Sequence, residues 1–257
     1  MPLVSTDAIV LHAFDYLESS RILRLLTRDA GMRSAVAKGM RKSARRFGGS
    51  VDLFARGTAH LYTREGRDLD TLGGFEDVRV RLELATDLSR FTGASVIAEL
   101  VLRFALAAAA DEGLFDVVVG ALDRLADARG AAAVEAVLGG AWRIVGELGF
   151  APSVDVCSDC HVPLASDEPV LFSHPAGGAL CQRCGRMARG RVLPPAARAA
   201  LSAWLRGEIV GIAAEGELRA HQRLLREFLE EHLTDGRPLR AYAAWETERW
   251  PEVGTAT

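Results

Sequence analysis

The sequence predicts an α+β protein in which an N-terminal β-barrel is followed by an α-helical domain with an embedded four-cysteine zinc module. Three observations lead to this fold class. Short apolar runs between turn residues come first, long Ala- and Leu-rich segments with a helical period follow, and all four cysteines occur in C-x2-C pairs. We expect the barrel over residues 1–78, the helical domain over 79–153 and 193–257, and the zinc module over 154–192.

The N-terminal part has the pattern of five short strands. Apolar runs of strand length alternate with turn signals such as Asp29-Ala30-Gly31 and Gly66 with its charged neighbours. Five strands in a segment of this length predict a small barrel, and an OB-fold fits the pattern, with an SH3-like barrel as the alternative on strand count. The expected strands are residues 8–14, 21–27, 32–37, 54–62 and 69–75.

A strongly basic segment joins the third and fourth expected strands. No acidic residue occurs between Asp29 and Asp52, whereas the basic residues of this window give it a formal charge of about +6 in a chain of net charge -3. Cationic side chains neutralise phosphates without reading any base, and glycines let the backbone approach a ligand closely. The segment therefore predicts a nucleic-acid site, with a solvated basic loop as the alternative. The candidate DNA-binding residues are Arg33, Lys38, Arg41, Lys42, Arg45 and Arg46.

After Asp77 the apolar period changes from two towards 3.6, which predicts helices. Breaks at Asp111-Glu112-Gly113 and Ala128-Arg129-Gly130 divide the first helical part into three segments. Two more segments follow the cysteines, and we expect them to close the same bundle, with Trp142, Trp204, Trp245 and Trp250 as packing residues. The expected helices are residues 88–110, 114–128, 131–148, 194–205 and 217–233.

The four cysteines follow the spacing C-x2-C-x20-C-x2-C. Each C-x2-C turn directs two thiolates at one metal, and two such turns complete a tetrahedral shell that suits zinc. Disulfides are the alternative, but the paired spacing in a sequence without a secretory signal favours metal. Four thiolates leave no position for water or substrate, so we expect one structural Zn²⁺ rather than a catalytic one. Its ligands are Cys157, Cys160, Cys181 and Cys184.

The residues around the cysteines lead to three further expectations. Apolar runs at 169–173 and 179–180 predict a hairpin that carries the second cysteine pair. His161 and His174 are expected to be turn or surface residues, because four cysteines already complete the shell. The arginines that follow either extend the basic surface or form a solvated edge, which we favour slightly: Arg183, Arg186, Arg189 and Arg191.

Composition argues against a membrane protein and against a disordered one. Apolar residues make up 49% and charged residues 25% of the chain, which is ordinary globular usage. The longest apolar stretch, at 104–110, is too short to span a bilayer, and charged residues interrupt the N-terminal apolar run that a signal peptide requires. We expect a cytoplasmic protein. P-loop, H-E-x-x-H and G-x-S-x-G motifs are absent from the sequence, so we do not expect an enzyme.

Several segments, taken together, resemble the RecO family of bacterial recombination mediators. The resemblance covers nearly the whole chain, and the combination is specific where any single motif is not. Besides the four cysteines, with Phe172-Ser173 and Gly177-Gly178 between them, it rests on residues 18–31, 35–39, 45–49, 69–72, 148–152, 232–233 and 237–240.

The resemblance implies an OB-fold, a helical domain and a zinc module in a protein of DNA repair and recombination. It implies binding to single- and double-stranded DNA, annealing of complementary strands, and cooperation with RecR to load RecA onto DNA coated with single-strand-binding protein (SSB). It also implies a cytoplasmic, nucleoid-associated bacterial protein. For the acidic C-terminal tail of SSB we expect an apolar groove with a basic rim in the helical domain, where Arg103, Arg124 and Arg143 are candidate cations.

Two other classes of protein stay open on the residues themselves. A zinc-ribbon accessory factor of transcription or translation would bind RNA or a polymerase, and a nuclease with an unrecognised site would cleave DNA with the help of a divalent metal. Annealing of complementary oligonucleotides separates a mediator from the accessory factor. Metal-dependent DNA cleavage would identify the nuclease.

Overall fold

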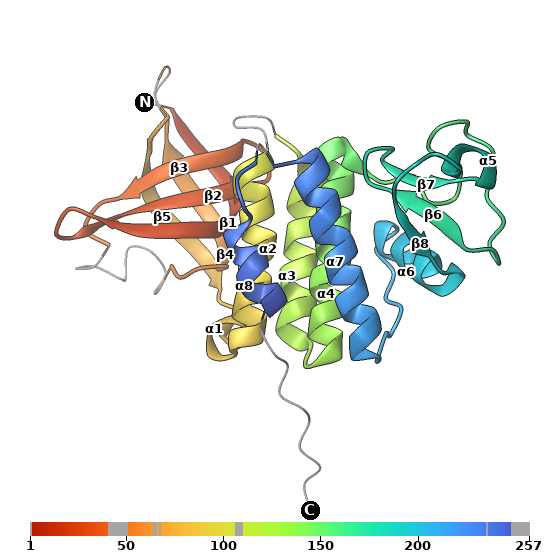
Figure 1. The fold of residues 1–257 in the computed structure, drawn as a ribbon. Coiled ribbons are helices and arrows are strands. Elements are labelled where there is room, and N and C mark those ends of the chain that lie inside the picture. Colours follow the sequence, from red (N-terminus) through yellow and green to blue (C-terminus); the bar gives the residue numbers. More distant parts are fainter. Residues whose placement is uncertain are drawn as a thin grey trace, which may run out of the picture.

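The computed structural model describes residues 2–40, 51–63, 66, 68–105, 110–234 and 236–247. These residues form three parts: a β-barrel, a bundle of helices, and a small three-stranded sheet with the cysteines beside it (Figure 1). The helices lie in the middle, so the barrel and the cysteine module are at opposite ends of the molecule. The α+β fold predicted from the sequence is confirmed.

Five strands form a closed, OB-like barrel in the order β1-β2-β3-β5-β4. β1 pairs antiparallel with both β2 and β4, and a short parallel pairing of β3 with β5 completes the closure. The number of strands is as predicted, but β1 extends beyond the expected run at both ends and β5 continues past residue 75. The strands are β1 (Leu3–Tyr16), β2 (Ser20–Thr27), β3 (Gly31–Ala37), β4 (Arg56–Tyr62) and β5 (Asp70–Arg79).

The helical part is built around one central helix, α4, which contacts α2, α3, α6 and α7. Helix α2 ends at Phe104 rather than at residue 110, and a short π-helical turn at Gly146–Phe150 follows α4. Helix α8 was not predicted, because it is short; it packs against α2. The helices are α1 (Leu82–Thr86), α2 (Leu88–Phe104), α3 (Glu112–Asp127), α4 (Ala131–Val145), α6 (Pro195–Leu205), α7 (Glu215–His232) and α8 (Arg240–Thr247).

Strand β1 separates two hydrophobic cores because its side chains alternate in direction. Ala8 and Val10 point into the barrel, whereas Ile9 and Leu11 belong to the larger core that the helices share. The attachment also has a polar component, since Arg28, which directly follows β2, pairs with Asp116 of α3 at 2.5 Å. The barrel is therefore held against the bundle by apolar packing with ion pairs at its edge.

The large side chains at the centre of the bundle are tryptophans, as expected. Trp142, Trp204 and Trp245 are all buried, and the ring of Trp142 lies 5.2 Å from that of Phe228 of α7. The fourth tryptophan, Trp250, lies outside the described residues. Burial of such large apolar groups accounts for much of the stability of a helical bundle of this size.

The cysteine module is inserted between α4 and α6. The predicted hairpin is present as β6 (Val170–Ser173) and β7 (Gly178–Leu180), and the short helix α5 (Gln182–Gly185) follows it. A third strand, β8 (Arg191–Leu193), pairs with β6 and was too short to be predicted. Gly178 is required in the hairpin, because a Cβ there would lie 2.2 Å from the carbonyl oxygen of Ser153.

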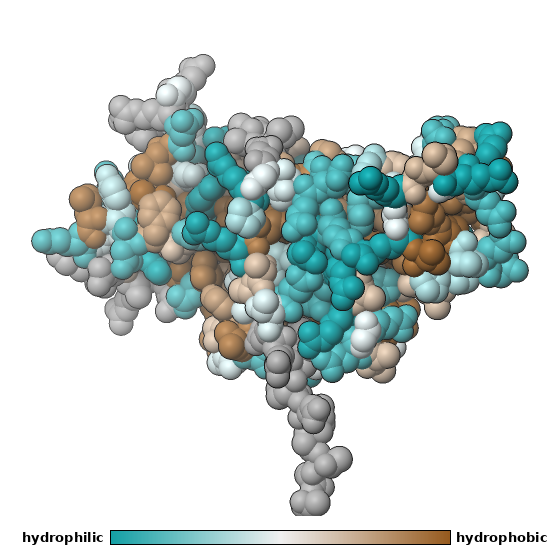
Figure 2. All heavy atoms as spheres, viewed as in Figure 1, coloured by the Kyte–Doolittle hydropathy of each residue, from teal (hydrophilic) through white to brown (hydrophobic). Residues whose placement is uncertain are grey.

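The surface differs along the molecule. Figure 2 shows hydrophilic residues over the outer side of α7, whereas hydrophobic residues reach the surface on the barrel and beside β6 and β8. Within the described ranges, none of the helices combines the length and the apolar character that crossing a bilayer would require.

Candidate functional site

The four cysteines that the sequence singled out come together at one point. Their sulfur atoms all lie within 4.8 Å of one another. Cys157 and Cys160 come from the turn before β6, Cys181 directly follows β7, and Cys184 lies in α5. A backbone hydrogen bond from Cys157 to the carbonyl of Val162, at 2.9 Å, holds the first turn. Two turns that are 20 residues apart thus present four thiols to one point.

The geometry of the cluster fits a tetrahedral metal ion. Zinc–sulfur bonds of about 2.3 Å separate the sulfurs of a tetrahedral shell by roughly 3.8 Å. The Sγ atoms of Cys160 and Cys181 are 3.8 Å apart. For Cys157, burial raises the thiol pKa, but hydrogen bonds from backbone N–H groups outweigh that effect and lower the pKa to about 6. The cluster can hold one metal ion as thiolates, and all four positions of the shell are then protein ligands.

A network of polar side chains fixes the cysteine module to helix α7. His174 lies in the turn after β6, as expected, but it is mostly buried rather than at the surface. Its Nε2 is 3.1 Å from Glu227, and Nε of Arg191 donates to the same carboxylate at 2.6 Å. The hydrogen bond from Arg191 is the main reason why the pKa of Glu227 is lowered. Arg191 is therefore paired within the protein although it is exposed, and the other three arginines of this cluster are exposed as well: Arg183, Arg186 and Arg189.

Two of the six candidate DNA-binding residues lie in the described part of the chain. Arg33 is 3.8 Å from Asp70, a carboxylate that is only 3% exposed, so Arg33 serves as the counterion of a buried acid. Burial raises the pKa of Asp70, and Arg33 opposes this shift. Lys38 is exposed in the turn after β3. The other four candidates, Arg41, Lys42, Arg45 and Arg46, lie outside the described residues, as does Phe47.

A row of exposed aromatic rings on β1 was missed by the sequence reasoning. His12, Phe14 and Tyr16 alternate along the strand, so they share one face. Phe14 is 43% and Tyr16 41% exposed, and the rings of His12 and Phe14 are 5.7 Å apart. Across the strand pair, Arg24 of β2 lies opposite His12. The signal was the alternation of residues 12–16, which extends past the expected end of the first strand.

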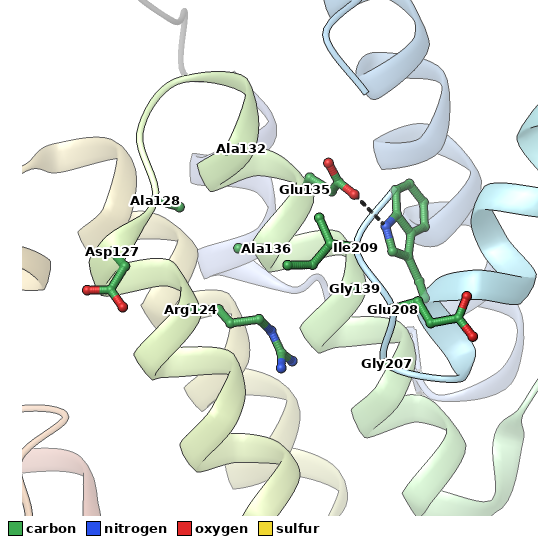
Figure 3. Close-up of a pocket in the computed structure, with 11 residues that line it drawn as sticks. Arg124, Asp127, Ala128, Ala132, Glu135, Ala136, Gly139, Gly207, Glu208 and Ile209 are labelled. Carbon is green, nitrogen blue, oxygen red and sulfur yellow. Dashed lines mark hydrogen bonds between the residues drawn. The ribbon is translucent and has the colours of Figure 1, made fainter. Parts of the chain in front are cut away.

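A cavity of about 290 Å³ lies on the helical part, between α3, α4 and the loop that joins α6 to α7. Figure 3 shows that Arg124 reaches into it from α3, while Ile209 comes from the loop. The walls are mainly apolar. We call this cavity the Arg124 pocket; its lining consists of Arg124, Asp127, Ala128, Ala132, Glu135, Ala136, Gly139, Trp204, Gly207, Glu208 and Ile209.

The cation in the lining of the Arg124 pocket is a half-buried arginine, and three carboxylates line the pocket as well: Asp127, Glu135 and Glu208. Of these, Glu135 accepts hydrogen bonds from backbone N–H groups and Glu208 pairs with Arg206. The guanidinium of Arg124 makes no hydrogen bond or ion pair with another residue in the described part of the chain. Burial lowers its pKa, and the neighbouring Arg143 lowers it further. Arg143 is not part of the lining and pairs with Glu147 at 3.6 Å. The unpaired guanidinium of Arg124 beside apolar walls is the group that could attract an anionic ligand. Arg103, the third arginine that the sequence suggested, lies elsewhere and donates to the carbonyls of Pro238 and Arg237.

An OB-like barrel joined to a helical bundle that carries a four-thiolate metal site defines the class of this protein. Comparison with known proteins gives the family. The model described as Recombination protein O N terminal matches residues 1–81, and Recombination protein O C terminal matches residues 85–241. The chain belongs to the RecO family of DNA repair proteins.

Curated relatives named DNA repair protein RecO are similar over nearly their full length. The relative from Anaeromyxobacter sp. (strain K) is 37% identical over 249 residues, which cover 94% of this chain and 95% of the relative. The one from Pelotomaculum thermopropionicum is 34% identical over 251 residues, with 95% and 93% covered. For Myxococcus xanthus the identity is 34% over 242 residues, with 91% and 93% covered.

Proposed function

We propose that this protein is a non-catalytic recombination mediator. It binds single- and double-stranded DNA, anneals complementary strands and, with RecR, helps to load RecA onto SSB-coated DNA. The observation that carries this proposal is the match of both halves of the chain to Recombination protein O. The place of action that follows from these partners is the bacterial nucleoid.

In this proposal the barrel binds DNA through its basic segment. Lys38, together with Arg41, Lys42, Arg45 and Arg46, neutralises phosphates, while Arg33 supports the strand that leads to them. Two DNA strands repel each other, so a protein that binds both backbones lowers the barrier to annealing and leaves the bases free to pair. Phosphate contacts of this kind do not depend on sequence.

The aromatic row on β1 adds a second kind of contact. Exposed rings can stack on the bases of a single strand, and such stacking is worth about 1–3 kcal/mol per base. Phe14 and Tyr16 are exposed and on one face of the strand, and Arg24 lies across from that row. We propose that they hold single-stranded DNA.

Zinc is the metal that fits the four-thiolate cluster best, and its role is structural. The donor set is the all-sulfur shell that tetrahedral Zn²⁺ prefers. Once bound, the ion would be held by Cys157, Cys160, Cys181 and Cys184, and it would stabilise the two turns that support β6 and α5. Because all ligands come from the protein, the shell leaves no coordination position for chemistry.

The Arg124 pocket is the proposed site for the acidic C-terminal tail of SSB. An apolar cavity holds the last side chain of such a tail, and Arg124, with Arg143 nearby, attracts its carboxylate. Arg124 suits this role because no described residue satisfies its charge. The DNA surface and the tail pocket then lie on different parts of the molecule, so both can be occupied at once.

The proposal is tested by DNA binding at several salt concentrations and by annealing of two complementary labelled oligonucleotides. We expect binding to single and double strands that weakens as salt increases, because counterions are released on binding, and we expect annealing to become faster. Binding to RNA or RNA polymerase without any effect on annealing would support the accessory factor instead. Cleavage of DNA in the presence of a divalent metal would identify a nuclease.

A further inference from the structure

A buried carboxylate accepts hydrogen bonds from the loop between α6 and α7. Glu135 of α4 is 5% exposed, and both of its oxygens accept hydrogen bonds from this loop. The backbone N–H groups of Val210, Gly211 and Ile212 donate to it at 2.6, 3.0 and 3.1 Å. The indole N–H of Trp204 donates at 3.2 Å (Figure 3). One carboxylate thus fixes three consecutive residues of the loop.

These hydrogen bonds do more than satisfy a buried charge. Burial raises the pKa of Glu135, but the hydrogen bonds from Val210, Gly211, Trp204 and Ile212 outweigh it, and the pKa is lowered. Residues 208–214 belong to no helix or strand, so this part of the loop has no hydrogen-bonded ladder of its own. Its conformation therefore depends on the contact with Glu135.

The fixed segment determines where one wall of the Arg124 pocket lies. Ile209 directly precedes the three residues that donate to Glu135, and it lines the pocket although it is 77% exposed. In the view of Figure 3, Ile209 lies between Glu135 and Arg124. Trp204, which also donates to Glu135, forms another part of the lining. The carboxylate that fixes the loop beside Ile209 is thus also bonded to a second apolar wall residue, Trp204, which α6 and the core hold as well.

We propose that Glu135 is a positioning residue for the Arg124 pocket: it places Ile209 and Trp204 so that the apolar end of an acidic peptide fits between them. This inference rests on the proposed binding of an acidic tail in that pocket. Glu135 acts through the loop. Arg124 binds the ligand's carboxylate. Glu135 does not contact the ligand, because its oxygens already accept hydrogen bonds from the protein's own N–H groups.

The chain offers a matched control for this role. Glu99 of α2 accepts backbone N–H groups from three consecutive residues at the start of α8: Arg240 at 2.8 Å, Ala241 at 3.0 Å and Tyr242 at 3.2 Å. Glu99 does not line the Arg124 pocket. Glu99→Gln and Glu135→Gln each replace one accepting carboxylate oxygen by an NH2 group, which cannot accept from a backbone N–H, and only the second substitution concerns the pocket.

The experiment measures binding of a fluorescent acidic peptide that ends in phenylalanine with a free carboxylate. We expect Glu135→Gln to weaken binding about tenfold, whereas Glu99→Gln should leave the affinity within about twofold, although both variants lose stability because hydrogen bonds to a carboxylate are lost. Gly211→Ala gives a second route. Gly211 has a φ of +82° with open space around its Cβ position, so alanine strains the loop without a clash and should also weaken binding.

A double-mutant cycle tests whether Glu135 acts through Ile209. Ile209→Ala should weaken peptide binding about fivefold in the otherwise unchanged protein and much less in the Glu135→Gln background, because the wall is then already displaced. Val192→Ala, at a residue of β8 that is 70% exposed, is the control and should have no effect. Full additivity of the two substitutions would overturn the positioning role.

The outcomes separate this inference from the proposed function. If the unchanged protein does not bind the peptide, tail binding in the pocket is wrong, and the role of Glu135 in it falls with it. If the unchanged protein binds and the Glu135→Gln and Gly211→Ala variants bind equally well, tail binding stands and the positioning role is overturned.

Discussion

The cysteine module and the Arg124 pocket are two binding sites built in different ways. The metal ligands come from two short turns, and the spacing within each turn already determines what the turns can hold. The pocket is made by α3, α4 and a loop some 75 residues further on. A site encoded by local spacing can be predicted residue by residue, whereas a site formed by packing distant segments is visible only in the folded chain.

Removal of the metal should have the largest effect, because it should destabilise the cysteine module and leave the Arg124 pocket nearly unchanged. Structural zinc contributes apparent binding free energies on the order of 10 kcal/mol, and that energy is coupled to folding. We expect metal analysis to find one zinc per chain. On chelation, hydrogen exchange should show that the cysteine module loses its structure. After chelation the affinity of the Arg124 pocket for the peptide should change little, whereas the cysteine module should lose its structure.

His161→Ala is the control for the metal experiment, because His161 lies between the cysteine pairs and is exposed. This variant should keep its zinc, whereas Cys160→Ser should lose it. The zinc prediction is wrong if protein purified without chelator, with its thiols reduced, contains almost no zinc.

The second prediction concerns His221 of α7, which contacts both regions. It is 2% exposed, its ring lies 4.7 Å from that of Trp204, and it also lines a cavity beside β8. Burial lowers its pKa from 6.5 to about 4, and Glu135 opposes this. The unfolded chain therefore takes up a proton at this residue between pH 6.5 and 4, while the folded chain does not. The free energy of unfolding should therefore decrease as the pH is lowered from 6.5 to 4, by roughly 3 kcal/mol in total.

Urea unfolding at pH 7, 5.5 and 4.5 measures this effect. The free energy of unfolding should depend less on pH in His221→Leu than in the unchanged protein. Equal slopes for His221→Leu and the unchanged protein would show that His221 can take up a proton in the folded state.

Third, Arg124→Ala should weaken binding of the acidic peptide about tenfold, because the peptide's carboxylate loses its cation at an apolar site. Arg103→Ala is the matched control, since Arg103 is also helical but is engaged with backbone carbonyls away from the Arg124 pocket. Isothermal titration with both variants decides the assignment. A greater loss for Arg103→Ala would move the tail site to the neighbourhood of α8.

The smallest expected effect is that of a single exposed lysine. Lys38→Ala should weaken DNA binding a few-fold for any sequence and reduce the slope of log affinity against log salt by about one, because one phosphate contact is lost. Arg189→Ala, in the basic cluster after the cysteines, should change neither quantity if that cluster is a solvated edge. The reverse result would place the DNA on the cysteine module.

The five barrel strands and most of the helices could be predicted, because turn residues and apolar periods mark them locally. The end of β1 was missed because Asp15 ends the apolar run after Phe14, although Asp15 and Tyr16 continue the strand's alternation. α8 and β8 are too short for a period to show. In each case the tertiary partner, α2 for α8 and β6 for β8, supplies what the local sequence does not.

The same reasoning explains what was predictable in the sites. The spacing of the four cysteines alone predicts that they come together as one metal-binding cluster. Arg124 was one of three arginines named for a tail groove, and only the fold separates it from Arg103, which donates to backbone carbonyls elsewhere. Glu135 could not be recognised at all, because three of its partners are backbone N–H groups 75 to 77 residues away, which carry no sequence signal, and the fourth is the indole N–H of Trp204, 69 residues away.

The most direct test of the account is annealing of complementary strands that are coated with SSB, compared with naked strands. We predict that the unchanged protein accelerates annealing in both cases, and that Arg124→Ala keeps its effect on naked strands but loses most of it on SSB-coated ones. No acceleration on either substrate would contradict the proposed mediator function, and equal rates for Arg124→Ala and the unchanged protein on coated strands would contradict the role of the Arg124 pocket.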